Sequence, residues 1–306
     1  MLFRNKPWLI LVVIAALTLF ALYAIDRFQH RFVRSDEDLL SLIPDGDSTI
    51  FFARVNLLRR AGMLEMIAGG RSTDPEYQKF VQATQFDYAK DIDALAGSVN
   101  ERCTVIIVRG HLDWPRIEAY VRNQSGTCNR GVCALQSTKS GTWISMVRLQ
   151  PDVVGVALGK ERSLVGTIHP GQRAAPHPFP VQPIWMKLAQ HLVKNPSTVP
   201  GALRIFLISL QPSNFVLLAV SSAPHGTGSA FEIELTAGCP SAAAADTVRK
   251  QLEIQTKMLK LELARQRQQP NPADLTGLLT SGTFDTSGAE VRGIWPVRKE
   301  LLKTLQ

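Results

Sequence analysis

The sequence predicts an α+β protein, in which an N-terminal transmembrane helix precedes two related domains of a ferredoxin-like or similar antiparallel sheet-plus-helix type. Three observations support this expectation. An uncharged apolar run lies near the N-terminus, β-branched segments alternate with segments of helical periodicity, and a proline-rich stretch divides the remainder. The 306 residues are enough for two ordinary domains besides the anchor.

The apolar run extends from Trp8 to Ile25. As a helix it would be about 27 Å long, close to the hydrocarbon thickness of a bilayer. A cleaved signal peptide is the alternative, but the run exceeds a usual signal-peptide core, and the bulky Tyr23 lies where small residues are preferred. We therefore expect a retained anchor, whose apolar side chains include Trp8, Leu11, Ile14, Leu17, Phe20 and Ile25.

Charges beside the anchor barely distinguish its two orientations. Arg4 and Lys6 precede the run, whereas Arg27, Arg31 and Arg34 follow it. Because positive residues tend to stay on the cytoplasmic side, the two flanks oppose each other. Orientation therefore has to come from other features.

Cysteine spacing provides one such feature. Cys128 and Cys133 bracket a short turn-like segment that would close a small disulfide loop in an oxidising compartment. Two buried thiols are the alternative, and a zinc site is disfavoured because Cys103 and Cys239 lie far away without paired ligands. We expect a single-pass protein of the inner (plasma) membrane, with its body on the extracytoplasmic side.

The first domain is expected to begin at the turn around Pro44. Apolar, β-branched runs predict strands over residues 49–55, 103–108, 132–136, 142–149 and 153–158. Asp74-Pro75 predicts the start of one helix, and Asp113-Trp114-Pro115 predicts another. The order predicted for the whole chain is a tail at 1–7, the anchor at 8–25, a basic flank at 26–42, a first domain at 43–166, a proline-rich linker at 167–183 and a second domain at 184–306.

The second domain is predicted to mix helices and strands in the same way. Residues 184–194 and 241–268 are expected to be helices, the longer one capped by Ser241. Strands are expected over 203–210, 215–221 and 230–236.

Two pairs of short, similar sequence segments indicate an internal duplication. Leu149-Gln150-Pro151 matches Leu210-Gln211-Pro212, each between two expected strands. Val108-Arg109-Gly110 with Trp114-Pro115 matches Val291-Arg292-Gly293 with Trp295-Pro296, and each is expected to end a strand and open a helix.

Three segments carry a resemblance: Ile43-Pro44-Asp45 with Arg54-Val55-Asn56, Phe86 to Asp93, and Arg109 to Asp113. On these, the sequence resembles an uncharacterised family of bacterial membrane-anchored proteins, found chiefly among acidobacteria. The resemblance covers mainly residues 42–158. It implies an extracytoplasmic body on an N-terminal anchor, and it supplies no catalytic residue.

Few residues are candidates for catalysis or metal binding. The six histidines share no metal-ligand spacing, and His111 with Asp113 is better explained by a helix cap. Asp87, Asp91 and Asp93 could hold a cation, but they lack the glycine and glutamate of an EF-hand loop, so a polar turn or cap is favoured.

Known catalytic and cofactor motifs are absent as well. Residues 155–160 have too short a spacing for a phosphate-binding loop, and Glu161 stands where a hydroxyl should bind magnesium. No GxSxG nucleophile motif occurs. We therefore expect no catalytic residues, cofactor or metal.

The formal charge of +8 allows a nucleic-acid partner, but the basic residues are scattered, and no RNA-binding aromatic signature accompanies them. We expect a non-enzymatic binding or structural module of the cell envelope. Its partners would be the lipid bilayer and an envelope protein or polymer, with no nucleic acid. The alternative is an unrecognised envelope hydrolase that uses His111, Asp113 and Asp91.

Overall fold

The structure is a computed structural model, and it describes residues 33, 35–44, 46–68, 75–137, 141–168, 180–199, 201–223 and 229–304. Within these ranges, no helix combines the length and the apolar character that crossing a membrane would need. The predicted anchor from Trp8 to Ile25 lies outside them. The expectation of a mixed α+β protein with an antiparallel sheet is confirmed.

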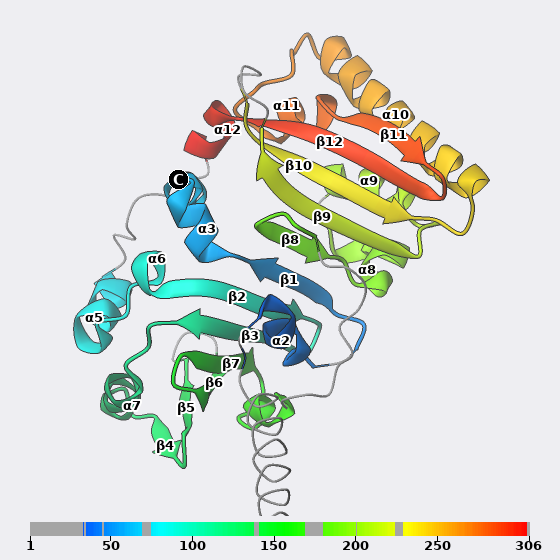
Figure 1. The fold of residues 1–306 in the computed structure, drawn as a ribbon. Coiled ribbons are helices and arrows are strands. Elements are labelled where there is room, and N and C mark those ends of the chain that lie inside the picture. The colour runs from blue at the N-terminus through cyan, green and yellow to red at the C-terminus, as the bar shows by residue number, and fades with distance from the viewer. Residues whose placement is uncertain are drawn as a thin grey trace, which may run out of the picture.

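One continuous antiparallel sheet runs through the described chain (Figure 1). Its strand order is β11-β12-β10-β9-β8-β1-β2-β3-β7-β6-β5-β4. The strands are β1 (Thr49–Ala53), β2 (Ile92–Val99), β3 (Cys103–Gly110), β4 (Thr127–Asn129), β5 (Val132–Gln136), β6 (Trp143–Gln150), β7 (Val153–Gly159), β8 (Ile184–Lys187), β9 (Phe215–Ser222), β10 (Ser229–Gly238), β11 (Thr283–Ser287) and β12 (Glu290–Arg298).

Helices cover the two faces of this sheet unequally. One face packs against α2 (Asp36–Ser41) and the 3-10 turn η1 (Leu164–Thr167). The other face packs against most of the remaining helices, including the long α10. The remaining helical elements are α3 (Val55–Arg60), α4 (Met63–Ala68), α5 (Pro75–Thr84), α6 (Tyr88–Asp91), α7 (Trp114–Asn123), α8 (Gln190–Lys194), η2 (Pro196–Thr198), α9 (Gly201–Ser209), α10 (Ala242–Arg265), α11 (Leu275–Thr280) and α12 (Lys299–Thr304).

Alternation along the strands explains how both faces can be apolar in the first half. Val153 and Ala157 of β7 lie in the core that α2 covers, whereas Val154 between them packs against α7. Successive strand residues point to opposite faces, so one strand contributes to two cores. In the second half, Arg292 and Ile294 of β12 stay exposed on the uncovered face, as an antiparallel sheet permits.

The two halves share one strand order. Outward from the centre of the sheet, the first half runs β1-β2-β3-β7-β6 and the second runs β8-β9-β10-β12-β11. Antiparallel pairing of β1 with β8 joins them, and Phe52 there stacks on Trp185 with ring centroids 5.7 Å apart. In a ferredoxin-like unit another strand separates the helix-linked strands, whereas here β1 and β2 are hydrogen-bonded neighbours.

Two secondary-structure expectations for the second half were wrong. Residues 203–209 belong to helix α9 and Leu210 to the turn after it, because the buried side chains Phe206, Ser209 and Leu210 recur at helical rather than alternating spacing. Residues 184–194 divide into strand β8 and helix α8, because Trp185 completes the core beside Phe52. Short apolar runs fit both structures, and the tertiary contacts decide between them.

The paired similar segments do not lie in equivalent secondary-structure elements of the two halves. Gln150 ends β6, whereas Gln211 follows helix α9. Trp114 opens helix α7, whereas Trp295 and Pro296 lie inside strand β12, so the expected helix opening at Pro296 was wrong. Similarity between the halves is therefore visible in their topology and not in those short matches.

Replacing Phe52 tests how far the fold depends on the central pair. Phe52 is buried, with 1% of its surface exposed, so Phe52→Ala should lower the free energy of unfolding by about 3–5 kcal/mol. Urea denaturation monitored by circular dichroism measures this change. Ile254→Ala, at a residue that is 54% exposed, is the control and should change stability by less than about 1 kcal/mol. Equal effects would contradict a central role for the pair.

Candidate functional site

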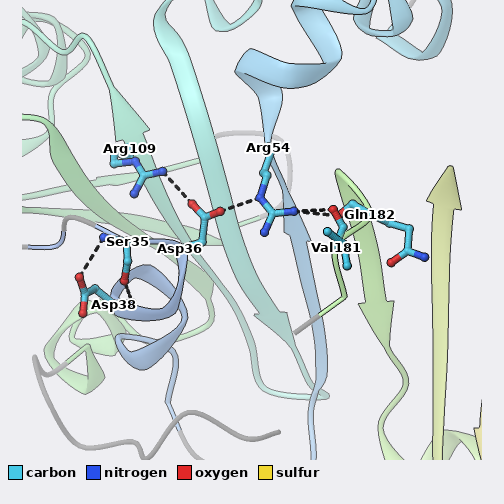
Figure 2. A network of polar contacts seen from close by, with 7 residues as sticks. All are labelled: Ser35, Asp36, Asp38, Arg54, Arg109, Val181 and Gln182. Atoms are coloured by element: carbon cyan, nitrogen blue, oxygen red, sulfur yellow. Dashed lines mark hydrogen bonds and ion pairs between the residues drawn. The ribbon is translucent and has the colours of Figure 1, made fainter. Parts of the chain in front are cut away.

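A polar network fastens the first described helix to the centre of the sheet (Figure 2). Asp36, the first residue of α2, accepts one hydrogen bond from Arg54 Nε at 2.6 Å and another from Arg109 Nη2 at 2.8 Å. Arg54 follows β1, and Arg109 lies near the end of β3. A single carboxylate therefore holds two strands and one helix together.

Arg54 extends this network to the second half of the chain. Its Nη1 donates to the carbonyl oxygens of Val181 at 2.8 Å and Gln182 at 3.2 Å (Figure 2). Its backbone N–H donates to the carbonyl of Pro183 at 2.7 Å. The chain entering β8 is thus fixed to the end of β1 by one arginine.

The network is half-buried. Side-chain exposure is 25% for Asp36, 22% for Arg54 and 17% for Arg109. Hydrogen bonds between charged groups in such surroundings contribute about 1–3 kcal/mol each, more than an exposed pair does. The Arg54 guanidinium also lies 5.4 Å from the Phe52 ring centroid, which ties the network to the core.

Local sequence determines the position of Asp36. Ser35 caps α2 by accepting from the Asp38 backbone N–H, and the Asp38 side chain accepts in return from the Ser35 N–H at 2.9 Å. This capping box fixes where the helix begins. Asp36 in the first turn is then favoured by the helix dipole.

Apolar contacts secure the other side of the segment. Leu39 and Leu40 of α2 are buried, as are Leu42 and Ile43 after it and Val33 before it. The expected basic flank at 26–42 thus includes, in its described part, an acidic helix that belongs to the core. Between Ile25 and Val33 lie seven residues, which reach at most about 28 Å when fully extended.

The signal for this network was present in the sequence but was not recognised. Ser35 and Asp38 have the spacing of a capping box, and Arg54 and Arg109 belong to the segments that carry the family resemblance. The pairing of Asp36 with Arg109 could not be predicted, because the two residues are 73 positions apart and meet only through the tertiary fold.

The residues of the hydrolase alternative do not form a catalytic array. His111 and Asp91 meet through the backbone, where the His111 N–H donates to the Asp91 carbonyl at 2.8 Å. Asp113 caps α7 and pairs with Arg116 at 3.0 Å. Among the described residues, no hydrogen bond or ion pair involves the His111 side chain.

The acidic cluster is a polar turn. Asp87 caps α6 by accepting from Ala89 N–H, and the Asp87 N–H donates to Asp91 Oδ2 at 2.7 Å. Tyr77 also donates to Asp87, and burial raises the pKa of Tyr77 to about 12. Within the described ranges, no group of three or more histidine, cysteine or acidic residues is arranged to hold a metal.

The expected disulfide is confirmed. Cys128 and Cys133 are bonded, and they face each other across the β4–β5 hairpin with Cα atoms 4.0 Å apart. Arg130 and Gly131 between them have φ angles of 48° and 77°, as a two-residue type I′ hairpin turn requires. Cys103 and Cys239 are free thiols.

A second polar contact crosses between the halves at the start of β1. Asp47 accepts from the backbone N–H groups of Gln190 at 2.6 Å and His191 at 2.9 Å, and it lies 3.0 Å from His191 Nδ1. Burial acts to raise the pKa of Asp47, but the hydrogen bonds from His191 and Gln190 outweigh it, so the pKa is lowered. The ionised carboxylate thereby holds α8 against β1.

Among the solved structures, the chain is similar to TP0453. No family model matches the chain, and no curated protein matches it. Crystal forms IV, I and III of TP0453 have TM-scores of 0.45, 0.47 and 0.48, with sequence identities of 10%, 11% and 9%. The matches cover 88–89% of this chain and 96–98% of that protein.

The Asp36 network can be tested by neutralising its carboxylate. Asp36→Asn should lower the free energy of unfolding by about 1–3 kcal/mol, because two half-buried guanidinium groups lose their counter-charge. Urea denaturation provides the measurement. Glu37→Gln makes the same chemical change at the next, exposed residue, and it should shift stability by less than about 0.5 kcal/mol. If the network did not stabilise the fold, the two variants would have the same free energy of unfolding.

The Asp47 contact predicts a pH dependence. Because the folded-state pKa is lowered, its contribution is present above the unfolded pKa of about 3.9 and is lost as pH falls through the folded value. Between pH 7 and pH 3, Asp47→Asn should therefore lose less stability than the parent protein. Chemical denaturation across that pH range measures the difference. Asp152→Asn, at an exposed turn, is the control, and its free energy of unfolding should change with pH as that of the parent protein does.

Proposed function

We propose that this chain is a membrane-anchored protein whose body lies on the extracytoplasmic side and serves as a non-enzymatic binding or structural module of the cell envelope. The observation that carries the proposal is the firm attachment of residues 33 and 35–43 to the body. Core packing and the Asp36 network both hold this segment. If residues 8–25 span a bilayer, the body remains within about 28 Å of its surface.

Two further features support this reading. The Cys128–Cys133 bond is typical of proteins in oxidising compartments. Candidate catalytic residues in the described part of the chain act instead as helix caps and turn residues, as Asp87 and Asp113 do. The lipid bilayer and an envelope protein or polymer are the partners that fit such a body.

We also infer that the halves arose by duplication of one unit. The common strand order outward from β1 and β8 supports this. Under this inference, β4 and β5 are an addition to the first copy, because they lie beyond β6 at the edge of the sheet.

Membrane attachment and thiol state test the proposed location together. The full chain should remain in the membrane pellet after alkaline carbonate washing, and deletion of residues 8–25 should release it. Thiol titration of the denatured, unreduced protein should find two free thiols, Cys103 and Cys239. Release of the full chain by carbonate would reject the anchor, and four free thiols in protein from its native compartment would reject the oxidising location.

A substrate screen tests the non-enzymatic role. The purified protein should hydrolyse no member of an ester, peptide and glycan panel at a rate above that of the triple variant His111→Ala, Asp113→Asn, Asp91→Asn. That variant removes the side chains of the hydrolase alternative. Hydrolysis that the parent performs and the variant loses would support an enzyme instead.

A further inference from the structure

A cavity of about 540 Å³ opens at the end of β2 and β7 and the start of β3, on the sheet face that α2 covers. Its volume falls within the range of about 300–1,000 Å³ that small-molecule sites occupy. Pro44 lies on one side, and Leu164 of the η1 turn lies on another. Neither the Asp36 network nor the disulfide hairpin contributes to its lining.

Apolar groups form the inner wall. Val105 is 1% exposed and belongs to the same core as α2. Leu164 and Cys103 pack against that core and also line the cavity. Such a wall favours the apolar body of a ligand over water.

One buried serine lines this cavity, and a second one precedes the neighbouring strand β1. Ser98 is 3% exposed and lines the cavity, yet its hydroxyl bonds to no residue that the structure describes. Ile50 is the cross-strand partner of Ser98, and Ser48, two residues earlier, has a buried Oγ with no partner in the described chain. The Ser98 hydroxyl lines the cavity, so it can donate a hydrogen bond to, or accept one from, a polar atom of a ligand.

Charges at the rim cancel. Arg102 and Lys160 are basic, whereas Glu101 and Glu161 are acidic, and all four are exposed. Within the described chain, none of them forms an ion pair. With two charges of each sign, the rim provides no net attraction to offset the cost of removing a charged ligand from water, so it favours a neutral molecule.

We propose that this cavity binds a small neutral molecule with an apolar body and one hydroxyl or carbonyl group, which hydrogen-bonds to Ser98. The site does not depend on the membrane anchor or on the compartment. A negative result for this site would therefore not contradict the function proposed above, and the reverse also holds.

The Cys103 thiol reports directly on occupancy. In the full chain held in an amphipathic polymer, Cys239→Ser leaves Cys103 as the one free thiol beside the Cys128–Cys133 bond. The probes are 1-hexanol and 1-chlorohexane, which share an alkyl body and differ in the hydroxyl group. Hexanol should slow the alkylation of Cys103 by iodoacetamide to a saturating limit, and chlorohexane should do so at higher concentration.

Substitutions in this background then separate a site from general apolar exposure. Ser98→Ala should weaken protection by hexanol about fivefold and leave that by chlorohexane unchanged, since one hydrogen bond is lost. Ser287→Ala, the same change on the exposed strand β11, should alter neither. Leu164→Trp should abolish protection by filling the cavity, and Thr167→Trp at its mouth is a second blocking variant if the first fails to fold.

Three outcomes would overturn the proposal. Hexanol could leave the alkylation rate of Cys103 unchanged up to its solubility limit. It could protect Ser98→Ala as well as the parent, or it could protect both folded tryptophan variants fully. Circular dichroism and urea denaturation of each variant establish that the compared proteins are folded.

Discussion

Antiparallel pairing of β1 with β8 is the interaction on which the rest of this structure depends. Each of these strands is also the first strand of its half, pairing outward with β2 or β9. The two halves therefore share one sheet and one core, in which Phe52 packs on Trp185. Two separately folded domains would each leave an edge strand unpaired, whereas the joined sheet exposes only β4 and β11 as its described edges.

Polar contacts concentrate along the same junction. Arg54, which Asp36 holds in place, binds the segment that leads into β8, and Asp47 binds the start of α8. The partners of Arg54 and Asp47 lie 127 and 143 positions away in the second half, so these contacts form only when the halves are assembled. The N-terminal segment that would leave a membrane anchor is consequently fastened to the junction and not to one half alone.

The outer ends of the sheet are protected in different ways. At one end, the β4–β5 hairpin is short, and a disulfide crosslinks it. At the other, β11 carries polar residues such as Asp285 and Thr286 along its edge. Short, crosslinked or polar edges resist unwanted strand pairing. The covered face near the first half, by contrast, leaves room for a cavity beside Ser98, where helix packing ends.

Local sequence by itself determined the α+β class, the first-half strands at 132–136 and 153–158, and the caps Asp113 and Ser241, because these depend on turns and neighbouring residues. Cysteine spacing likewise predicted the disulfide. Tertiary structure decided the rest. Residues 203–210 are a short apolar run that would also suit a strand, yet packing against the sheet makes residues 203–209 helical. Helix α2 begins at a local capping box, whereas strand β2, the β1–β8 pairing and the Asp36 network depend on long-range contacts, for which no local pattern in the sequence supplies the partner.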